Sequence, residues 1–153
     1  MKQLHSYWAY LVLAVLILAV ANAVIGLASK KEFKAKDLRL GLFALIFTHI
    51  QLLIGLAWYF MSPIYKAMKS EGMGAIMKEA PLRLLAVEHP ISMLLGIVLI
   101  TIGWSKHKKQ TTAQGKFKMF VLFYGIALLV ILSRIPWNQW LQNNTLRGLH
   151  AAT

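Results

Sequence analysis

Four apolar blocks of similar length constrain the fold of this chain more than any other feature. They cover about residues 7–28, 40–61, 84–104 and 117–135. Each is close to the ~20 residues that a helix needs to cross the roughly 30 Å hydrocarbon core of a bilayer. Only helices and closed barrels satisfy their backbone hydrogen bonds inside hydrocarbon, and these blocks are continuous rather than alternating. They therefore predict an all-α protein with four transmembrane helices.

Positive charge is concentrated in two short connections between the blocks. Ten of the 17 Lys and Arg residues lie there: Lys30, Lys31, Lys34, Lys36, Arg39, Lys106, Lys108, Lys109, Lys116 and Lys118. Short connections favour an up-down bundle, in which these two loops share one side. The positive-inside bias makes that side cytoplasmic. We predict one integral membrane domain, residues 1–153, in the bacterial cytoplasmic membrane, with both termini on the periplasmic side.

A net charge of +12 is compatible with binding to nucleic acid or to anionic lipid. Because the basic residues flank apolar helices, the pattern favours anionic headgroups of the bilayer over nucleic acid. The chain has no cysteine, which excludes disulfides, thiolate metal centres and covalent c-type haem attachment. The long connection 62–83 mixes apolar and charged residues, so we consider a short interfacial helix interrupted at Gly72 and Gly74, or a solvated loop.

Ionisable side chains inside the apolar blocks are functional candidates, because charge is costly in hydrocarbon. They are His49, Glu88, His89 and Arg134, with His5 at the outer edge of the first block. A rise of about 1.5 Å per residue places Glu88, His89 and Arg134 at one depth in the outer half of the membrane. On the same count, His49 lies about 9 Å closer to the cytoplasm than His89, and His5 lies about 12 Å farther out.

Glu88 and Arg134 are expected to form an intramembrane ion pair, since an unpaired charge at this depth would be unfavourable. Arg134 has two alternatives to this ion pair. Its side chain can pair with the carboxylate of a ligand, or it can extend toward the outer headgroups.

The histidines have two interpretations. Each can be a neutral imidazole that bonds to a backbone carbonyl or to a nearby polar side chain. Alternatively, His49 and His89, on consecutive antiparallel helices, can be the two axial ligands of haem b, with His5 in reserve. Arg83 and Arg134, both on the outer side, would then neutralise the haem propionates. A tilt, or a kink at Pro90, would have to remove the difference in depth between His49 and His89.

Several segments of the chain resemble small bacterial four-helix membrane proteins described as cytochrome b-like. The segments are "LHSYWAYLVL", "KKEFKAKDLRLGLFALIFTHIQLLIGLAWYF", "AVEHPISMLLGIVLITIGWSK" and "GIALLVILSRIPW". The resemblance implies that His5, His49 and His89 are the marked histidines. It also implies haem b as the cofactor.

Two functions of different classes therefore follow. One is a b-type cytochrome-like carrier that transfers electrons within the membrane, with a quinone as a candidate partner. The other is a cofactor-free accessory subunit, whose buried polar groups fix packing against other membrane subunits.

Overall fold

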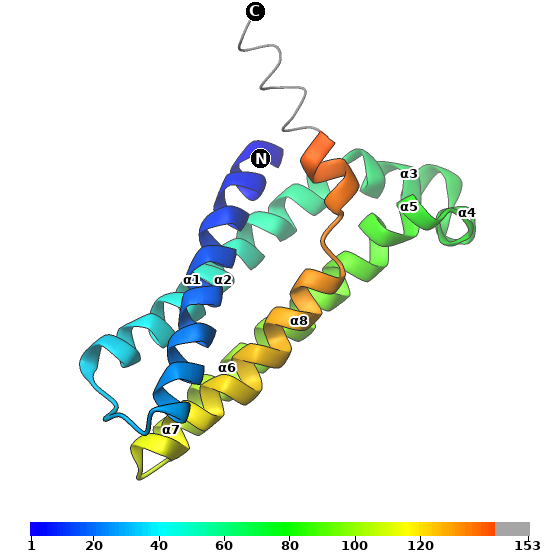
Figure 1. Cartoon of the computed structure of the whole chain (residues 1–153). Helices are drawn as coiled ribbons and strands as arrows, with labels where there is room; N and C mark the ends of the chain where they lie inside the picture. Colours follow the sequence, from blue (N-terminus) through cyan, green and yellow to red (C-terminus); the bar gives the residue numbers. More distant parts are fainter. Residues whose placement is uncertain (143–153) are drawn as a thin grey trace, which may run out of the picture.

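Four long helices form an antiparallel bundle in the computed structural model, which describes residues 1–142 (Figure 1). The described residues contain no strand, so the all-α prediction is confirmed. Four helical stretches are long and apolar enough to cross a membrane: Lys2–Ala28, Ala35–Met61, Ala80–Lys108 and Ala113–Ser133. The predicted blocks fall inside these stretches, apart from the last two residues of the fourth.

The third and fourth membrane helices are composite. The helical elements in chain order are α1 (Lys2–Ala28), α2 (Ala35–Met61), α3 (Pro63–Glu71), α4 (Met73–Lys78), α5 (Ala80–Arg83), the π-turn η1 (Leu84–Glu88), α6 (His89–Lys108), α7 (Ala113–Met119), the π-turn η2 (Phe120–Tyr124) and α8 (Gly125–Ser133). Both membrane helices thus contain one π-turn, a wider turn that often occurs at functional sites.

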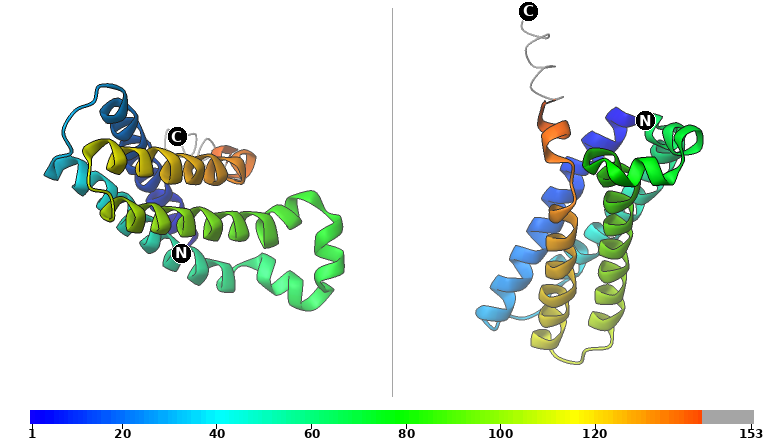
Figure 2. Two further views of the ribbon diagram at one scale, coloured as in Figure 1. Left: turned by 90° about the horizontal axis from the view of Figure 1, so that it is seen from below. Right: turned by 90° about the vertical axis from the view of Figure 1, so that its right-hand side faces the viewer.

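The two ends of the bundle differ. The N-terminus and the segment α3–α5 lie at one end, which we call the N-terminal end (Figure 1). The two lysine-rich loops, after α1 and after α6, lie at the other, which we call the basic end. Both α1 and α6 pack on α2 and on the fourth membrane helix, so α1 and α6 face each other diagonally across the bundle (Figure 2).

Aromatic side chains of the fourth membrane helix fill the core, and glycines of α1 and α2 receive them. A Cβ atom added to Gly26 would lie 2.6 Å from the ring of Phe117, and one added to Gly41 would lie 2.6 Å from Phe120. Tyr124 is fully buried, and its hydroxyl donates to the carbonyl of Gly41 at 2.8 Å. Close approach at Gly41 therefore brings α2 against η2.

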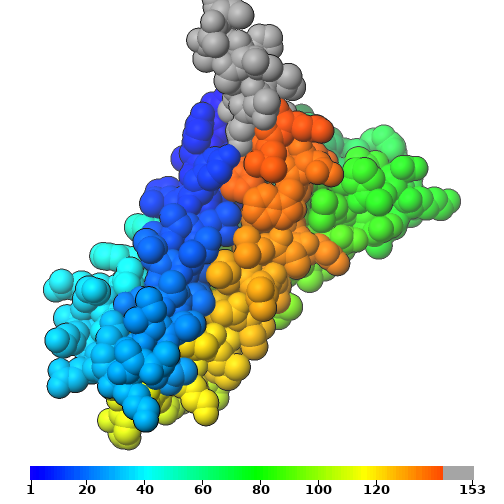
Figure 3. Space-filling model, in the orientation of Figure 1, coloured from blue at the N-terminus to red at the C-terminus, as the bar shows by residue number. Residues whose placement is uncertain are grey.

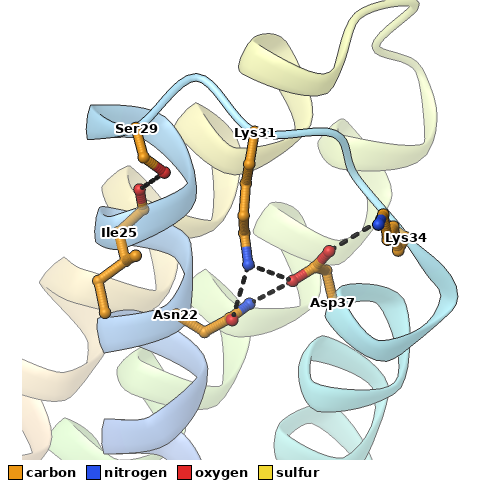
Figure 4. A network of polar contacts seen from close by, with 6 residues as sticks. All are labelled: Asn22, Ile25, Ser29, Lys31, Lys34 and Asp37. Carbon is orange, nitrogen blue, oxygen red and sulfur yellow. Dashed lines mark hydrogen bonds and ion pairs between the residues drawn. The ribbon is translucent and has the colours of Figure 1, made fainter.

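A carboxylate fixes the loop between α1 and α2 at the basic end (Figure 4). Asp37 is only 4% exposed and accepts hydrogen bonds from Asn22 Nδ2 at 2.7 Å, Lys31 Nζ at 3.2 Å and the Lys34 backbone N–H at 2.8 Å. Asp37 lies three residues after Lys34, the N-cap residue directly before α2. The carboxylate thus satisfies a free N–H at the helix start and neutralises the ammonium group of Lys31.

Candidate functional site

Pro90 is accommodated in the third membrane helix by a side chain of α2. Proline has no N–H, so Pro90 cannot donate to the carbonyl of Ala86 four residues earlier. The hydroxyl of Tyr59 donates to that carbonyl at 2.7 Å. The π-turn η1 ends directly before Pro90, with the N–H of His89 bonded to the carbonyl of Leu84. The expected kink at Pro90 therefore takes the form of a π-turn whose free carbonyl is bonded from outside the helix.

Replacing Tyr59 by Phe is expected to lower the free energy of unfolding by about 1–3 kcal/mol, because the buried carbonyl of Ala86 loses its donor. Unfolding of the detergent-solubilised protein, followed by circular dichroism, measures the change. Tyr65→Phe is the matched control: Tyr65 packs against Tyr59 and Phe60, but its hydroxyl has no hydrogen-bond partner in the part of the chain that the structure describes. Equal losses in the two variants would contradict the assignment.

His89 faces His5 across the diagonal of the bundle. Their ring centroids are 6.2 Å apart and the ring planes are perpendicular. Nδ1 of His89 lies 2.8 Å from the carbonyl oxygen of Arg134. Because a carbonyl only accepts, Nδ1 carries the proton, and Nε2 of His89 is left with a free lone pair.

The depth estimate from the sequence did not bring these two rings together, for two reasons. First, α6 continues to Lys108, four residues beyond the predicted boundary at Trp104, so His89 lies about 6 Å farther from the actual end of its helix than from the predicted end. Second, α1 is inclined to α6 (Figures 1 and 2), so its 27 residues cover less depth than a helix parallel to α6 would cover.

The surroundings of His5 leave polar atoms without partners. Gly55 lies opposite its ring, where an added Cβ would come within 3.2 Å of Cε1. Gln51 Nε2 donates to the backbone carbonyl of His5 at 2.9 Å. Nδ1 of His5 and Oε1 of Gln51 are buried, and neither has a hydrogen-bond partner among residues 1–142. Buried polar atoms without partners are uncommon and indicate that a group can still be received there.

His49, the predicted partner of His89, bonds within its own helix and to α6 in the structure. Nδ1 of His49 lies 2.7 Å from the carbonyl of Leu45, one turn earlier in its own helix, and Nε2 lies 3.4 Å from Thr101 Oγ1 on α6. The rings of His49 and His89, both described, make no contact with each other.

His107 lies away from this site. It is 1% exposed near the end of α6, beyond the helix boundary predicted at Trp104, and is stacked on Phe120. The boundary was misplaced because the helix continues beyond the last apolar residue. His150, assigned to an exposed tail, lies outside the described residues.

Glu88 lies between two guanidinium groups, next to His89 in the chain. Its Oε1 is 2.9 Å from Arg83 Nε, and its Oε2 is 3.5 Å from Arg134 Nε. The Arg83 contact spans five residues along the π-turn, a spacing that the apolar pattern does not signal. Arg83 also donates to the carbonyl of Met77, and Arg134 to that of Ser133. One carboxylate with two guanidiniums leaves this cluster with a net charge of about +1 near neutral pH.

Glu88→Gln is expected to lower the free energy of unfolding by about 1.5 kcal/mol, the lower part of the range for hydrogen bonds to charged groups, because all three side chains are partly exposed. The loss arises because both guanidiniums keep their charge while their shared partner becomes neutral. Glu71→Gln on α3 is the control, since Glu71 has no ion pair with any described residue. If both variants unfold alike in detergent, Glu88 does not hold the two arginines.

The comparisons with known proteins identify no relative of this chain. No protein-family model, no curated protein and no solved structure matches it.

Proposed function

We propose that the chain is a multi-pass membrane protein that holds one haem b between His5 and His89 and transfers electrons within the membrane. The distance between the two imidazoles carries this proposal. When two imidazoles bind one iron, their centroids are about 6 Å apart, because each metal–nitrogen bond is about 2 Å and each ring centre lies about 1 Å farther on. The rings of His5 and His89 are separated by 6.2 Å.

The residues around the pair fit this use. The carbonyl of Arg134 holds His89 with Nε2 free, which is how metal-binding histidines are commonly oriented by a second partner. Gly55 leaves room for the ring of His5, and the unpartnered Nδ1 belongs to the same imidazole. The two ligands come from diagonally opposite helices, and cofactor sites in helix bundles are built in this way from facing helices.

The cluster of Arg83, Glu88 and Arg134 would bind the acidic groups of the cofactor. Its excess of one positive charge complements a carboxylate, and guanidinium groups recognise carboxylates through paired hydrogen bonds. When bound, haem supplies a one-electron redox couple. The chain's own residues provide the two imidazoles, orient His89 and neutralise carboxylates at the N-terminal end.

The proposal extends to location and partners. The basic loops at one end support a cytoplasmic position of that end in a bacterial inner membrane, which places His5 and His89 in the periplasmic half. A quinone, which is soluble in the bilayer, and other membrane subunits are the candidate electron-transfer partners.

The test is the absorption spectrum of the protein, purified in mild detergent from cells supplied with a haem precursor. A b-type Soret band, an alpha band in the reduced-minus-oxidised spectrum and about one haem per chain by pyridine haemochrome are expected. A folded protein that remains colourless after incubation with hemin would contradict the proposal and favour the accessory subunit.

The orientation in the membrane gives a separate prediction. A reporter that is active only in the periplasm should be active when fused to the C-terminus and inactive when inserted at Thr112, in the loop after α6. A reporter that works only in the cytoplasm should give the opposite pattern. An active cytoplasmic reporter at the C-terminus would reverse every assignment of side, but would leave the His5–His89 site unchanged.

A further inference from the structure

The segment α3–α5, Pro63–Arg83, projects sideways from the N-terminal end of the bundle, and we call it the arm (Figures 1 and 3). Only Ser62 separates the end of α2 at Met61 from the start of α3. At its other end the arm continues directly into η1 at Leu84. Because both neighbours belong to membrane-spanning helices and there is no spacer, the arm must lie close to the membrane surface.

The arm is fixed to the bundle rather than loosely attached. Ile76 on α4 is fully buried, and the hydroxyl of Tyr59 on α2 also lies 3.3 Å from Met68 Sδ on α3. Ser62 accepts a hydrogen bond from the Tyr65 N–H and thereby caps α3. Gly72 separates α3 from α4 with φ +84°, a left-handed conformation that suits glycine. The arm therefore has a defined orientation relative to the membrane helices.

Apolar side chains of α4 remain uncovered on this fixed arm. Met73 and Met77 are four residues apart and so share one face of α4, where they are 47% and 41% exposed. The arm also carries exposed basic side chains, which form no ion pair with any described residue: Lys66, Lys69 and Lys78. Basic side chains beside an apolar face are typical of a segment that lies in the plane of a membrane interface.

We propose that the arm is an in-plane membrane anchor, whose partner is the phospholipid interface itself. Met73 and Met77 enter the boundary between headgroups and acyl chains, while the lysines contact the phosphates. Methionine is unbranched and flexible, so it can fit the irregular packing of lipid chains. The lysines complement the negative charge of phosphate. This inference is independent of any cofactor.

The lack of cysteine in the chain makes a direct test possible, because any introduced cysteine is the only one. Nitroxide labels would be attached to Met73→Cys, Met77→Cys and Lys69→Cys, one at a time, in the full chain reconstituted into phosphatidylcholine–phosphatidylglycerol vesicles. Relaxation by oxygen, which concentrates in lipid, is compared with relaxation by a water-soluble nickel chelate. Leu53→Cys, on the exposed face of α2, is the lipid reference, and Thr112→Cys is the aqueous reference.

Labels at positions 73 and 77 should be relaxed more strongly by oxygen than by nickel and report a depth of about 5–10 Å below the phosphates. The label at position 69 should show the reverse preference. Strong nickel relaxation at both 73 and 77 would overturn the proposal, because the arm would then stand in water. Protection of both positions from both reagents would also overturn it, since a protein surface would then cover them. Circular dichroism of each labelled variant verifies the fold before the comparison.

Discussion

Replacing either His5 or His89 by alanine is expected to abolish haem binding, while replacing His49 by alanine leaves it intact. Removing a group that only orients a metal ligand already weakens metal binding by about 10- to 100-fold, so removing a ligand should cost more than about 100-fold. His49 is bonded to Leu45 and Thr101, away from the pair, and should not contribute.

Haem titration of the three purified variants gives the affinities, and circular dichroism shows whether each variant folds. Added imidazole should restore a low-spin spectrum in His5→Gly and His89→Gly, a response that a misfolded protein would not give. If His49→Ala loses haem and His5→Ala keeps it, the pair inferred from the sequence, His49 with His89, is the correct one.

Replacing Asp37 by alanine is expected to be more destabilising than Tyr59→Phe or Glu88→Gln, with a loss of about 3 kcal/mol in the free energy of unfolding, the lower end of the range for a buried ion pair because Lys31 is partly exposed. The substitution removes the acceptor of the Asn22 amide and the Lys34 N–H, and it leaves Lys31 with only its 3.3 Å hydrogen bond to Asn22. No other described carboxylate is buried to this extent.

Chemical unfolding in detergent measures this loss, with two variants for comparison. Glu32→Ala, which removes an exposed carboxylate from the same loop, should have little effect. Asn22→Ala, which removes the hydrogen bond to Asp37 and the one from Lys31, should have an intermediate effect of about 1–2 kcal/mol. If Asp37→Ala and Glu32→Ala have similar stabilities, the network does not hold the loop.

The membrane helices could be predicted from the sequence because hydropathy determines which segments can cross hydrocarbon. The ends of these helices could not be predicted in the same way, because a helix continues past its apolar run until its terminal backbone groups find other partners. The prediction ended the third helix at Trp104, yet α6 includes Lys106, His107 and Lys108. Charged residues are good helix formers, so the end of an apolar run is not the end of the helix.

The polar residues of the candidate site could be chosen from the sequence, but the distances between them could not be predicted. The cost of charge in hydrocarbon identified His89, Glu88 and Arg134. The imidazole that lies nearest to His89 is determined by the inclination of the helices and by the residues at which they end. Neither can be predicted from the lengths of the apolar blocks. The role of Tyr59 was missed because it depends on the carbonyl left free by Pro90. In retrospect, a proline inside a membrane helix signals that some neighbouring donor is required.

The π-turn before His89 also bears on how the chain can change in length. A π-turn contains one residue more than the α-helical turns around it, so it is the place where the third membrane helix could lose a residue and still remain continuous. A π-turn uses more residues than an α-helical turn to complete one rotation, so loss of the extra residue would leave the segments on either side in nearly the same rotational phase. A deletion elsewhere in the third membrane helix would instead rotate these segments by about 100° relative to each other. Residues 84–88 are therefore the stretch in which a single codon could be lost while the arm and His89 keep their directions.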